Sequence, residues 1–173
     1  MLCISQIKFI VYKQLEKTMA KVGKGIQLPL SWIPGSSGCY PHNAVNVEDV
    51  YVIRSKHGGE LLPGKLIPAH GRCYCPYDGK ELQSNDYEVL CDSSVPGTVK
   101  GYGWEEASGG HIPKNAIVAG ISKDGSPLYV VKGYVGGELC IGKLHDGHPC
   151  AYLPWGGKEN RVDEYDVLVW RKH

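Results

Sequence analysis

The sequence has almost no excess charge of either sign. It contains 19 Lys and Arg residues against 18 Asp and Glu residues, for a formal net charge of +1, and the basic residues are scattered along the chain. Nucleic acids and acidic membrane surfaces are recognised through clustered basic side chains. The charge pattern therefore argues against nucleic acid as a partner.

Long apolar runs are also missing. No stretch approaches the roughly 20 apolar residues that a membrane-spanning helix needs. The first residues lack a positive region before an apolar run, and Lys8, Lys13 and Glu16 interrupt the apolar residues of this segment. We therefore expect no membrane span and no secretory signal. A cytoplasmic location is the resulting expectation, with non-classical release as the route to the outside.

A helical period is absent after residue 24. Instead, 23 glycines and 11 prolines separate short runs rich in Val, Ile, Tyr and Leu, which predicts an all-β chain. The pairs Gly58-Gly59 and Gly136-Gly137 are predicted to be hairpin turns with positive φ. The predicted strands are residues 50–55, 60–67, 72–77 and 87–91, followed by 128–134, 138–144, 149–155 and 165–170.

The sequence does contain an internal repeat. Lys65–Leu90 matches Lys143–Leu168 without a gap at an offset of 78 residues (143 − 65), whereas Trp32 matches Trp104 at an offset of 72 (104 − 32). The second copy therefore carries six extra residues (78 − 72) around Ser122–Ser126. Its Asp-Gly pair, flanked by apolar residues, predicts a longer hairpin loop.

The repeat sets the expected domain organisation: an N-terminal arm at residues 1–24, a first repeat at 25–97 and a second repeat at 98–173. A half of about 70 residues buries only a marginal core on its own, so the halves should pack on each other. The predicted fold is all-β, with two tandem antiparallel β repeats related by pseudo-two-fold symmetry and a short N-terminal arm.

The seven cysteines do not correspond between the copies. A duplicated disulfide framework is therefore not expected. Cys73 and Cys75 point the same way on a strand and could begin a metal site with His70 and Cys91. Their counterparts in the second copy are apolar, which favours the interpretation of small buried side chains and free thiols without a metal.

Two polar elements survive in both copies. One is Gly64-Lys65 with Gly142-Lys143, and the other is Gly79-Lys80-Glu81 with Gly157-Lys158-Glu159. The glycines could be kept for turns, and Lys with Glu could form a cross-strand ion pair worth only about 0.2–1 kcal/mol. The paired lysines are harder to explain in this way, because a solvated lysine on a strand is freely exchanged for other polar residues.

A lysine and a carboxylate beside aromatic rings suit a neutral, hydroxyl-rich ligand. The carboxylate accepts hydrogen bonds from vicinal hydroxyls, the ammonium donates to their oxygens, and a ring covers the apolar face of a sugar. Tyr77 or Trp155 and Tyr74 or Tyr152 are the candidate rings, although aromatics at alternating strand positions are more often core. The pattern thus indicates a carbohydrate ligand.

An enzyme is the competing interpretation. Glu60 with Glu81, or Glu138 with Glu159, could form the acid and base of a glycoside hydrolase. Hydrolases rarely need the same constellation twice in one short chain, whereas duplicated weak sites raise avidity by about 10²–10⁴. No phosphate loop, zinc signature or nucleophile triad is recognisable. We therefore expect a binding protein without enzymatic activity, cofactor or metal.

The ordered motifs resemble the DM-nine repeat family. These motifs are Trp…Gly…Pro-x-Asn-Ala-(Val/Ile), Tyr-Val, Gly-Gly-Glu-Leu-x-x-Gly-Lys, Gly-Lys-Glu and Tyr-(Glu/Asp)-Val-Leu, present twice between Trp32 and Trp170. The resemblance implies a tandem-repeat β protein. Several members are mannose-binding lectins that recognise and agglutinate microbes in innate defence, and members can form homodimers. The implied partners are mannose-type glycans on microbial or cell surfaces.

The resemblance also implies which residues bind. The family's ligand-binding lysine matches Lys65 and Lys143. Its binding aspartate falls on Ser122 in the second copy, with Asp124 two residues on, while the shorter loop of the first copy offers Asn46, Glu48 or Asp49. The expected ligand-binding residues are Lys65, Glu81, Asp49, Lys143, Glu159, Ser122 and Asp124. The alternative function is a non-lectin cytosolic interaction protein that responds to stress or infection.

Overall fold

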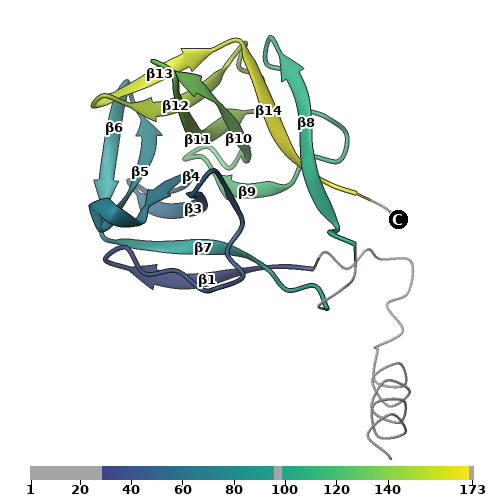
Figure 1. Ribbon diagram of the computed structural model, residues 1–173. Coiled ribbons are helices and arrows are strands. Elements are labelled where there is room, and N and C mark those ends of the chain that lie inside the picture. Colours follow the sequence, from purple (N-terminus) through teal and green to yellow (C-terminus); the bar gives the residue numbers. More distant parts are fainter. Residues whose placement is uncertain (1–28, 96–98, 172–173) are drawn as a thin grey trace, which may run out of the picture.

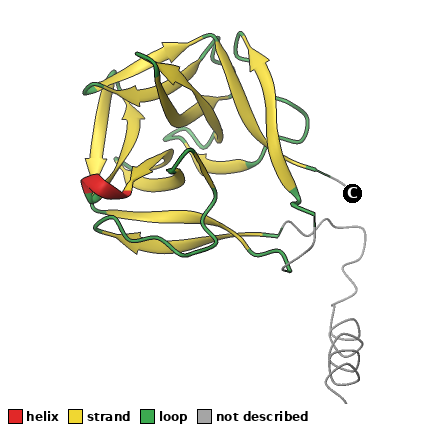
Figure 2. Cartoon of the chain, in the orientation of Figure 1, coloured by secondary structure: helices red, strands yellow, loops and turns green. Residues whose placement is uncertain are grey.

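The computed structural model describes residues 29–95 and 99–171. The predicted N-terminal arm lies outside the described residues. Within them the chain is built from strands, and the one helical element is the short 3-10 turn η1 (Pro68–His70), red in Figure 2. The prediction of an all-β fold is therefore confirmed.

Seven strands come from each half of the described chain. The first seven are β1 (Leu30–Ser36), β2 (Asn46–Val47), β3 (Val50–His57), β4 (Glu60–Ile67), β5 (Arg72–Tyr77), β6 (Lys80–Ser84) and β7 (Asp86–Asp92). The others are β8 (Tyr102–Ser108), β9 (Val118–Ile121), β10 (Pro127–Val135), β11 (Glu138–His145), β12 (Ala151–Trp155), β13 (Lys158–Val162) and β14 (Glu164–Trp170).

The strand order shows the two-fold relation directly. The continuous path through the antiparallel sheet runs β1-β7-β3-β4-β5-β6-β13-β12-β11-β10-β14-β8, so reading it from either end meets equivalent strands. The halves join at its centre, where β6 and β13 pair through Lys80 and Lys158. Figure 1 shows this seam at the upper left, away from the edge strands β1 and β8. The predicted pseudo-symmetric pair of antiparallel repeats is confirmed.

The hairpin turns follow the predicted chemistry. Gly58-Gly59 joins β3 to β4 with φ values of 57° and 89°, and Gly136-Gly137 joins β10 to β11 with values of 62° and 82°. Two consecutive positive φ values define the turn that best matches strand twist. The six-residue insertion is also a loop, since Ser122 N donates to the Ser126 carbonyl at 3.0 Å between β9 and β10.

The two halves share apolar core. One buried cluster combines side chains from both: Val45, Val52 and Leu90 of the first half with Ile117, Ala119, Val130, Ile141 and Leu168 of the second. Strand β9 of the second half also pairs with β4 of the first through Ile121 and Leu61. Burial of the large aliphatic members of this cluster contributes about 1.5–3 kcal/mol each, so both halves depend on the shared core.

Candidate functional site

The two predicted lysines occupy equivalent central strands. Lys65 lies on β4 opposite Tyr74 of β5, and Lys143 lies on β11 opposite Tyr152 of β12. Both lysines are buried, at 3% and 8% exposure. A lysine is almost never so deeply buried unless its charge is paired.

The glycines before these lysines are kept for close packing. A Cβ on Gly64 would collide with the carbonyl oxygen of Tyr74, and a Cβ on Gly142 with that of Tyr152. Neither glycine has a positive φ. The turn explanation offered for the sequence pattern holds for Gly79 and Gly157 instead, whose φ values are 76° and 78°.

Each lysine is paired with the predicted glutamate of its own repeat. The Nζ–carboxylate distance is 3.7 Å for Lys65 with Glu81 on β6, and 3.1 Å for Lys143 with Glu159 on β13. The second carboxylate oxygen of each glutamate reaches the opposite repeat. Glu81 accepts from the Gly157 N–H at 2.8 Å and Glu159 accepts from the Gly79 N–H at 2.8 Å. Each glutamate therefore holds a lysine and the hairpin turn of the other repeat.

Tyrosine rings flank the ammonium groups. Lys65 Nζ lies 5.7 Å from the ring centre of Tyr74. Lys143 Nζ lies 5.7 Å from the rings of both Tyr152 and Tyr77, and Tyr77 comes from the first half of the chain. These distances permit cation–π attraction. The structure thus brings three of the four candidate rings to the lysines.

Each lysine, with its glutamate and the tyrosine rings beside it, forms what we call an array. The sequence interpretation missed a histidine in each array. His70 Nδ1 lies 2.9 Å from the Tyr74 hydroxyl, and His148 Nδ1 lies 2.9 Å from the Tyr152 hydroxyl. The signal was present, because His-x-x-x-Tyr recurs at the offset of 78 residues. The second array has one further histidine, His145, whose ring stacks on that of His148 with centroids 4.1 Å apart.

A cavity of about 690 Å³ opens at the second array. Its size falls in the usual range for small-molecule sites. Four lining residues come from the first half of the chain and seven from the second, so neither half alone forms it. The lining consists of Glu60, Tyr77, Asp78 and Gly79, together with Ser122, Lys143, His145, His148, Tyr152, Glu159 and Arg161.

Ser122 and Asp124 are in the predicted loop, but they face different surroundings. Ser122 is buried and lines the cavity. Its hydroxyl donates to the Asp124 carboxylate, which also accepts from the Ser126 N–H at 3.1 Å. These hydrogen bonds, the Ser122 bond first, lower the pKa of Asp124 to about 2. Asp124 is exposed and fixes the loop that presents Ser122 to the cavity.

Asp49 is not brought to the first lysine by any described contact. It is exposed on the two-residue turn between β2 and β3. The side chains in polar or ring contact with Lys65 in the described structure are Glu81, Tyr74 and Cys140, whose Sγ lies 3.3 Å from Nζ. The two arrays therefore differ in their immediate surroundings.

The glutamate of the second cavity is engaged by the protein itself. Glu60 lines the same cavity as Glu159, which comes from the other half of the chain. Both Glu159 oxygens are engaged, one by Lys143 and one by the Gly79 N–H. A carboxylate held in this way is poorly placed to exchange a proton with a substrate.

Five of the six cysteines in the described residues are buried, and Cys39 is exposed. Cys73, Cys75 and Cys91 belong to a buried cluster made of first-half side chains together with Leu128 of the second half. The six cysteines at positions 39–150 are free, while Cys3 lies outside the described residues. Across residues 29–95 and 99–171, no group of three or more His, Cys, Asp or Glu side chains could hold a metal ion.

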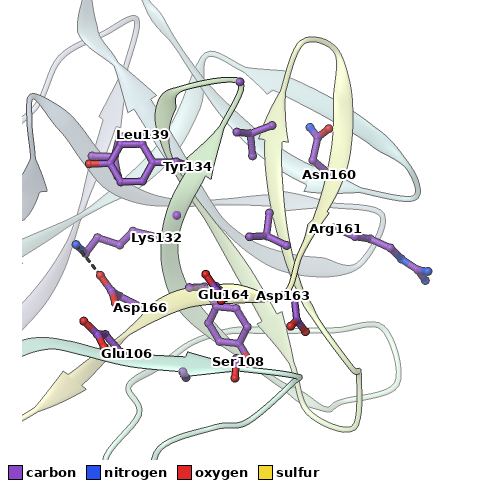
Figure 3. Close-up of a pocket in the computed structure, with 16 residues that line it drawn as sticks. Glu106, Ser108, Lys132, Tyr134, Leu139, Asn160, Arg161, Asp163, Glu164 and Asp166 are labelled. Carbon is purple, nitrogen blue, oxygen red and sulfur yellow. Dashed lines mark ion pairs between the residues drawn. The ribbon is translucent and has the colours of Figure 1, made fainter.

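A larger groove of about 1140 Å³ contains none of the predicted residues. It lies on the second half, and Figure 3 shows its Lys132–Asp166 ion pair, with a distance of 2.8 Å. Lys132 also lies over the ring of Trp104, at 5.4 Å.

The equivalent residues of the first half repeat this arrangement, with Arg54 2.6 Å from Glu88 and 4.3 Å from the Trp32 ring. This recurrence is typical of a structural tie to the edge strands.

No helix in the described part of the chain is long and apolar enough to cross a membrane.

Comparisons with known proteins agree with the repeat. The sequence matches the family model of the DM9 repeat over residues 45–162. It is 34% identical to Natterin-4 of Thalassophryne nattereri over 144 residues, which cover 80% of this chain and 33% of that protein. It is 28% identical to Natterin-3 of the same organism over 97 residues, which cover 56% and 23%. The chain therefore spans a third or less of the length of these relatives.

Among solved structures, the chain resembles the nematode sperm cell motility protein MFP2B. The TM-score is 0.58, and the match covers 84% of this chain and 46% of that one. Because the sequences are only 18% identical, the likeness concerns the fold alone.

Proposed function

The chain belongs to the DM9 repeat family, and from this membership we propose that it is a carbohydrate-binding, lectin-like protein of innate defence. Its ligands are mannose-type glycans on microbial or cell surfaces. The family supports the general function, and the cavity at Lys143 supports the location of the site.

The observation that carries this proposal is the position of Lys143. Its ammonium lies 5.7 Å from the ring centres of both Tyr77 and Tyr152, in the lining of a cavity large enough for a small sugar. One N–H of the ammonium points to the Glu159 carboxylate, and the remaining N–H groups can donate to sugar oxygens. Ser122 accepts from a sugar hydroxyl, and Asp124 keeps Ser122 in place.

The array of Lys65 forms the first-repeat site, with Glu81 orienting the lysine. Asp49, which no described contact joins to Lys65, is included as the acidic acceptor by the family resemblance alone. A single sugar site with millimolar affinity contributes only about −4 kcal/mol. Two sites in one chain, and four in a homodimer, raise the apparent affinity, because once one site is occupied the others meet the glycan at a high effective concentration. This multiplicity accounts for agglutination by weak individual sites.

Binding is favoured over catalysis because the carboxylates of both arrays are engaged in ion pairs and turn contacts. The same engagement fixes the lysines in one orientation before a ligand arrives. Preorganisation of this kind lowers the cost of binding. The alternative, a cytosolic interaction protein without glycan ligands, predicts that the purified chain leaves every glycan unbound.

The decisive test is a glycan array followed by lysine variants. The parent protein should bind mannose-type glycans and agglutinate mannan-bearing cells. Lys65→Ala or Lys143→Ala should weaken its own site about ten- to a hundredfold, because a charged hydrogen bond contributes about 1.5–3 kcal/mol. The double variant should lose agglutination.

Lys132→Ala is the matched control, since Lys132 also forms an ion pair but lies outside the cavity. Binding is compared at a temperature at which the thermal transition shows each variant to be folded. A double variant that agglutinates like the parent and is still inhibited by free mannose would show that these lysines are not the site. A blank array would replace the lectin by the cytosolic interaction protein.

A further inference from the structure

We propose that Tyr152 contacts the ligand through its hydroxyl and that His148 sets the direction of this hydroxyl, so that binding at the second site weakens as the pH falls. This inference rests on the proposed function, because it concerns the cavity at Lys143. It adds His148 to that site, a role for the Tyr152 hydroxyl and a condition under which the site works.

The hydrogen bond between the two side chains allows only certain arrangements. Tyr152 lines the cavity, and its hydroxyl lies 2.9 Å from His148 Nδ1. When His148 is neutral, Nδ1 can accept the tyrosine proton, and the hydroxyl oxygen, which Arg161 also approaches, can then accept a hydrogen bond from a ligand. When His148 is charged, Nδ1 must donate, and the tyrosine proton has to point elsewhere. For the neutral tautomer with hydrogen on Nε2, a change in the charge of His148 therefore decides whether Tyr152 accepts or donates towards the cavity.

The same pair in the first half indicates that it is more than incidental packing. His70 and Tyr74 repeat the 2.9 Å distance, and their rings are also nearly perpendicular, at 82° against 74° for the second pair. The three residues between histidine and tyrosine differ completely between the copies, Gly-Arg-Cys against Pro-Cys-Ala. The polar pair has thus been kept while its local sequence changed.

The second site differs from the first in the side chain that faces the histidine. His145 stacks on His148, whereas the equivalent position in the first half is Ile67. Partial burial lowers the pKa of His148 below its usual value, and the charges of His145, Lys143 and Arg161 act in the same direction. Arg161 lines this cavity and also the larger groove, where Figure 3 labels it.

Acidic groups oppose this effect without cancelling it. Glu159 raises the pKa of His148, and the carboxylates of Glu60 and Asp78 line the same cavity. His145 in turn faces Asp124 of the neighbouring loop, and its Nδ1 lies 2.8 Å from the Asp146 carbonyl. The net direction for the pKa of His148 remains downward. The second site therefore keeps its neutral form to a lower pH than an isolated histidine would.

The sign of the pH dependence comes from two effects of the ligand. A sugar hydroxyl that accepts from Lys143 still has its own hydrogen to donate. Tyr152 accepts that hydrogen better when His148 is neutral, because its oxygen is then not already accepting from His148. A bound sugar also displaces water from the cavity, which disfavours the charged imidazolium. Both effects favour neutral His148 in the complex. Binding is thus complete above the His148 pKa and is lost as the pH falls through it.

The test measures affinity against pH by calorimetry in a Lys65→Ala background, which leaves only the second site. The probe is the mannose-type glycan that binds most tightly on the array. Affinity should fall about tenfold between about pH 7.5 and about pH 5, because a shift of one pKa unit on binding corresponds to a tenfold change. Tyr152→Phe should weaken binding and flatten the profile, while His145→Ile should move the midpoint to higher pH.

His42→Gln is the control, because His42 is exposed and lies outside the cavity lining. Its profile should equal that of the background. If Tyr152→Phe fails to fold, the His148 pKa measured by NMR with and without glycan gives the same answer, since the glycan should lower it. Binding that does not change with pH would overturn this inference and leave the lectin function standing. Absence of glycan binding at every pH would overturn both.

Discussion

At the scale of single residues, the buried lysine–glutamate pairs are the least replaceable features of the chain. Lys143 and Glu159 are each about 10% exposed at the side chain, and Glu159 also accepts from the Gly79 N–H. Two buried charges lose their hydration on folding, and the attraction between them has to offset the free energy of that loss. Removing one partner leaves the other buried and uncompensated.

Glu159→Gln should therefore destabilise the protein by about 3 kcal/mol. The amide oxygen can still accept from Gly79, so the loss reports the charge and not the hydrogen bond. Adding Lys143→Met should recover most of the stability, because an apolar side chain of similar length then replaces the unpaired charge. Urea unfolding of the parent, the single variant and the double variant gives the free energy of unfolding of each.

Asp166→Asn supplies the comparison, because Asp166 pairs with Lys132 where both side chains are 20–29% exposed. More exposed pairs contribute about 0–1 kcal/mol. If Glu159→Gln costs no more than Asp166→Asn, burial of the Lys143–Glu159 pair does not make it the stronger stabilising contact.

The sequence predicted the two lysines but only some of the residues around them. Lys65 and Lys143 could be selected because a polar residue had survived in both copies without a turn to explain it. The His–Tyr pairs carried the same internal signal and were not recognised, because neither residue suggests a charge interaction on its own. The joining of Glu81 to the Gly157 turn depends on strand pairing between repeats, which no local pattern encodes.

At the scale of elements, the turns show where the backbone is strained. The Gly-Gly hairpins satisfy two positive φ values at no steric cost. The turn between β2 and β3 has the same conformation without glycine, since Glu48 and Asp49 have φ values of 50° and 62°. A non-glycine residue in this region costs about 1–2 kcal/mol, somewhat less for Asp.

Asp49→Gly should therefore stabilise the protein by about 0.5–1 kcal/mol, after the added entropy of glycine in the unfolded chain is subtracted. The same substitution should weaken the first-repeat site if Asp49 is its acidic acceptor. Thermal unfolding and glycan binding are measured on one sample.

Gly59→Ala is the reverse control, because a Cβ there meets no atom within 4 Å and the φ of 89° is the sole cost. It should destabilise the protein by about 1 kcal/mol. A destabilised Asp49→Gly variant would contradict the strain argument.

The elements that the sequence predicted are those with continuous apolar runs. The predicted ranges 50–55, 60–67 and 72–77 correspond to β3, β4 and β5, and the second copy repeats the agreement. β6 and β13 were missed, because their sequences KELQS and KENRV contain a single apolar residue each. They are strands because they pair with a neighbour on each side, which is a tertiary effect.

At the scale of the whole molecule, the two halves are joined by shared contacts, and we expect them to unfold as one cooperative unit. They share a buried cluster, the β4–β9 pairing and the seam between β6 and β13. The seam is closed by reciprocal contacts, from Glu81 to Gly157 and from Glu159 to Gly79. Separation would expose the cluster and leave both carboxylates without their turn contacts.

Residues 98–173 expressed alone should therefore show no cooperative thermal transition like that of the intact chain. Mixing this fragment with residues 25–97 should restore one, because the missing half completes the core. Circular dichroism during heating follows both samples. A fragment that melts like the intact protein would show that the halves are independent, and the boundaries at residues 25–97 and 98–173 would then mark separate domains.

The reciprocal seam also bears on how repeats can be added to such a chain. Each Gly-Lys-Glu turn is completed by its two-fold equivalent, and an isologous contact of this kind closes at two copies and offers nothing to a third. A third repeat would keep an unmatched carboxylate and an unmatched turn unless a fourth joined it. Growth of the array by duplication is therefore expected to proceed in pairs, so that the unit inherited is the couple and not the single repeat.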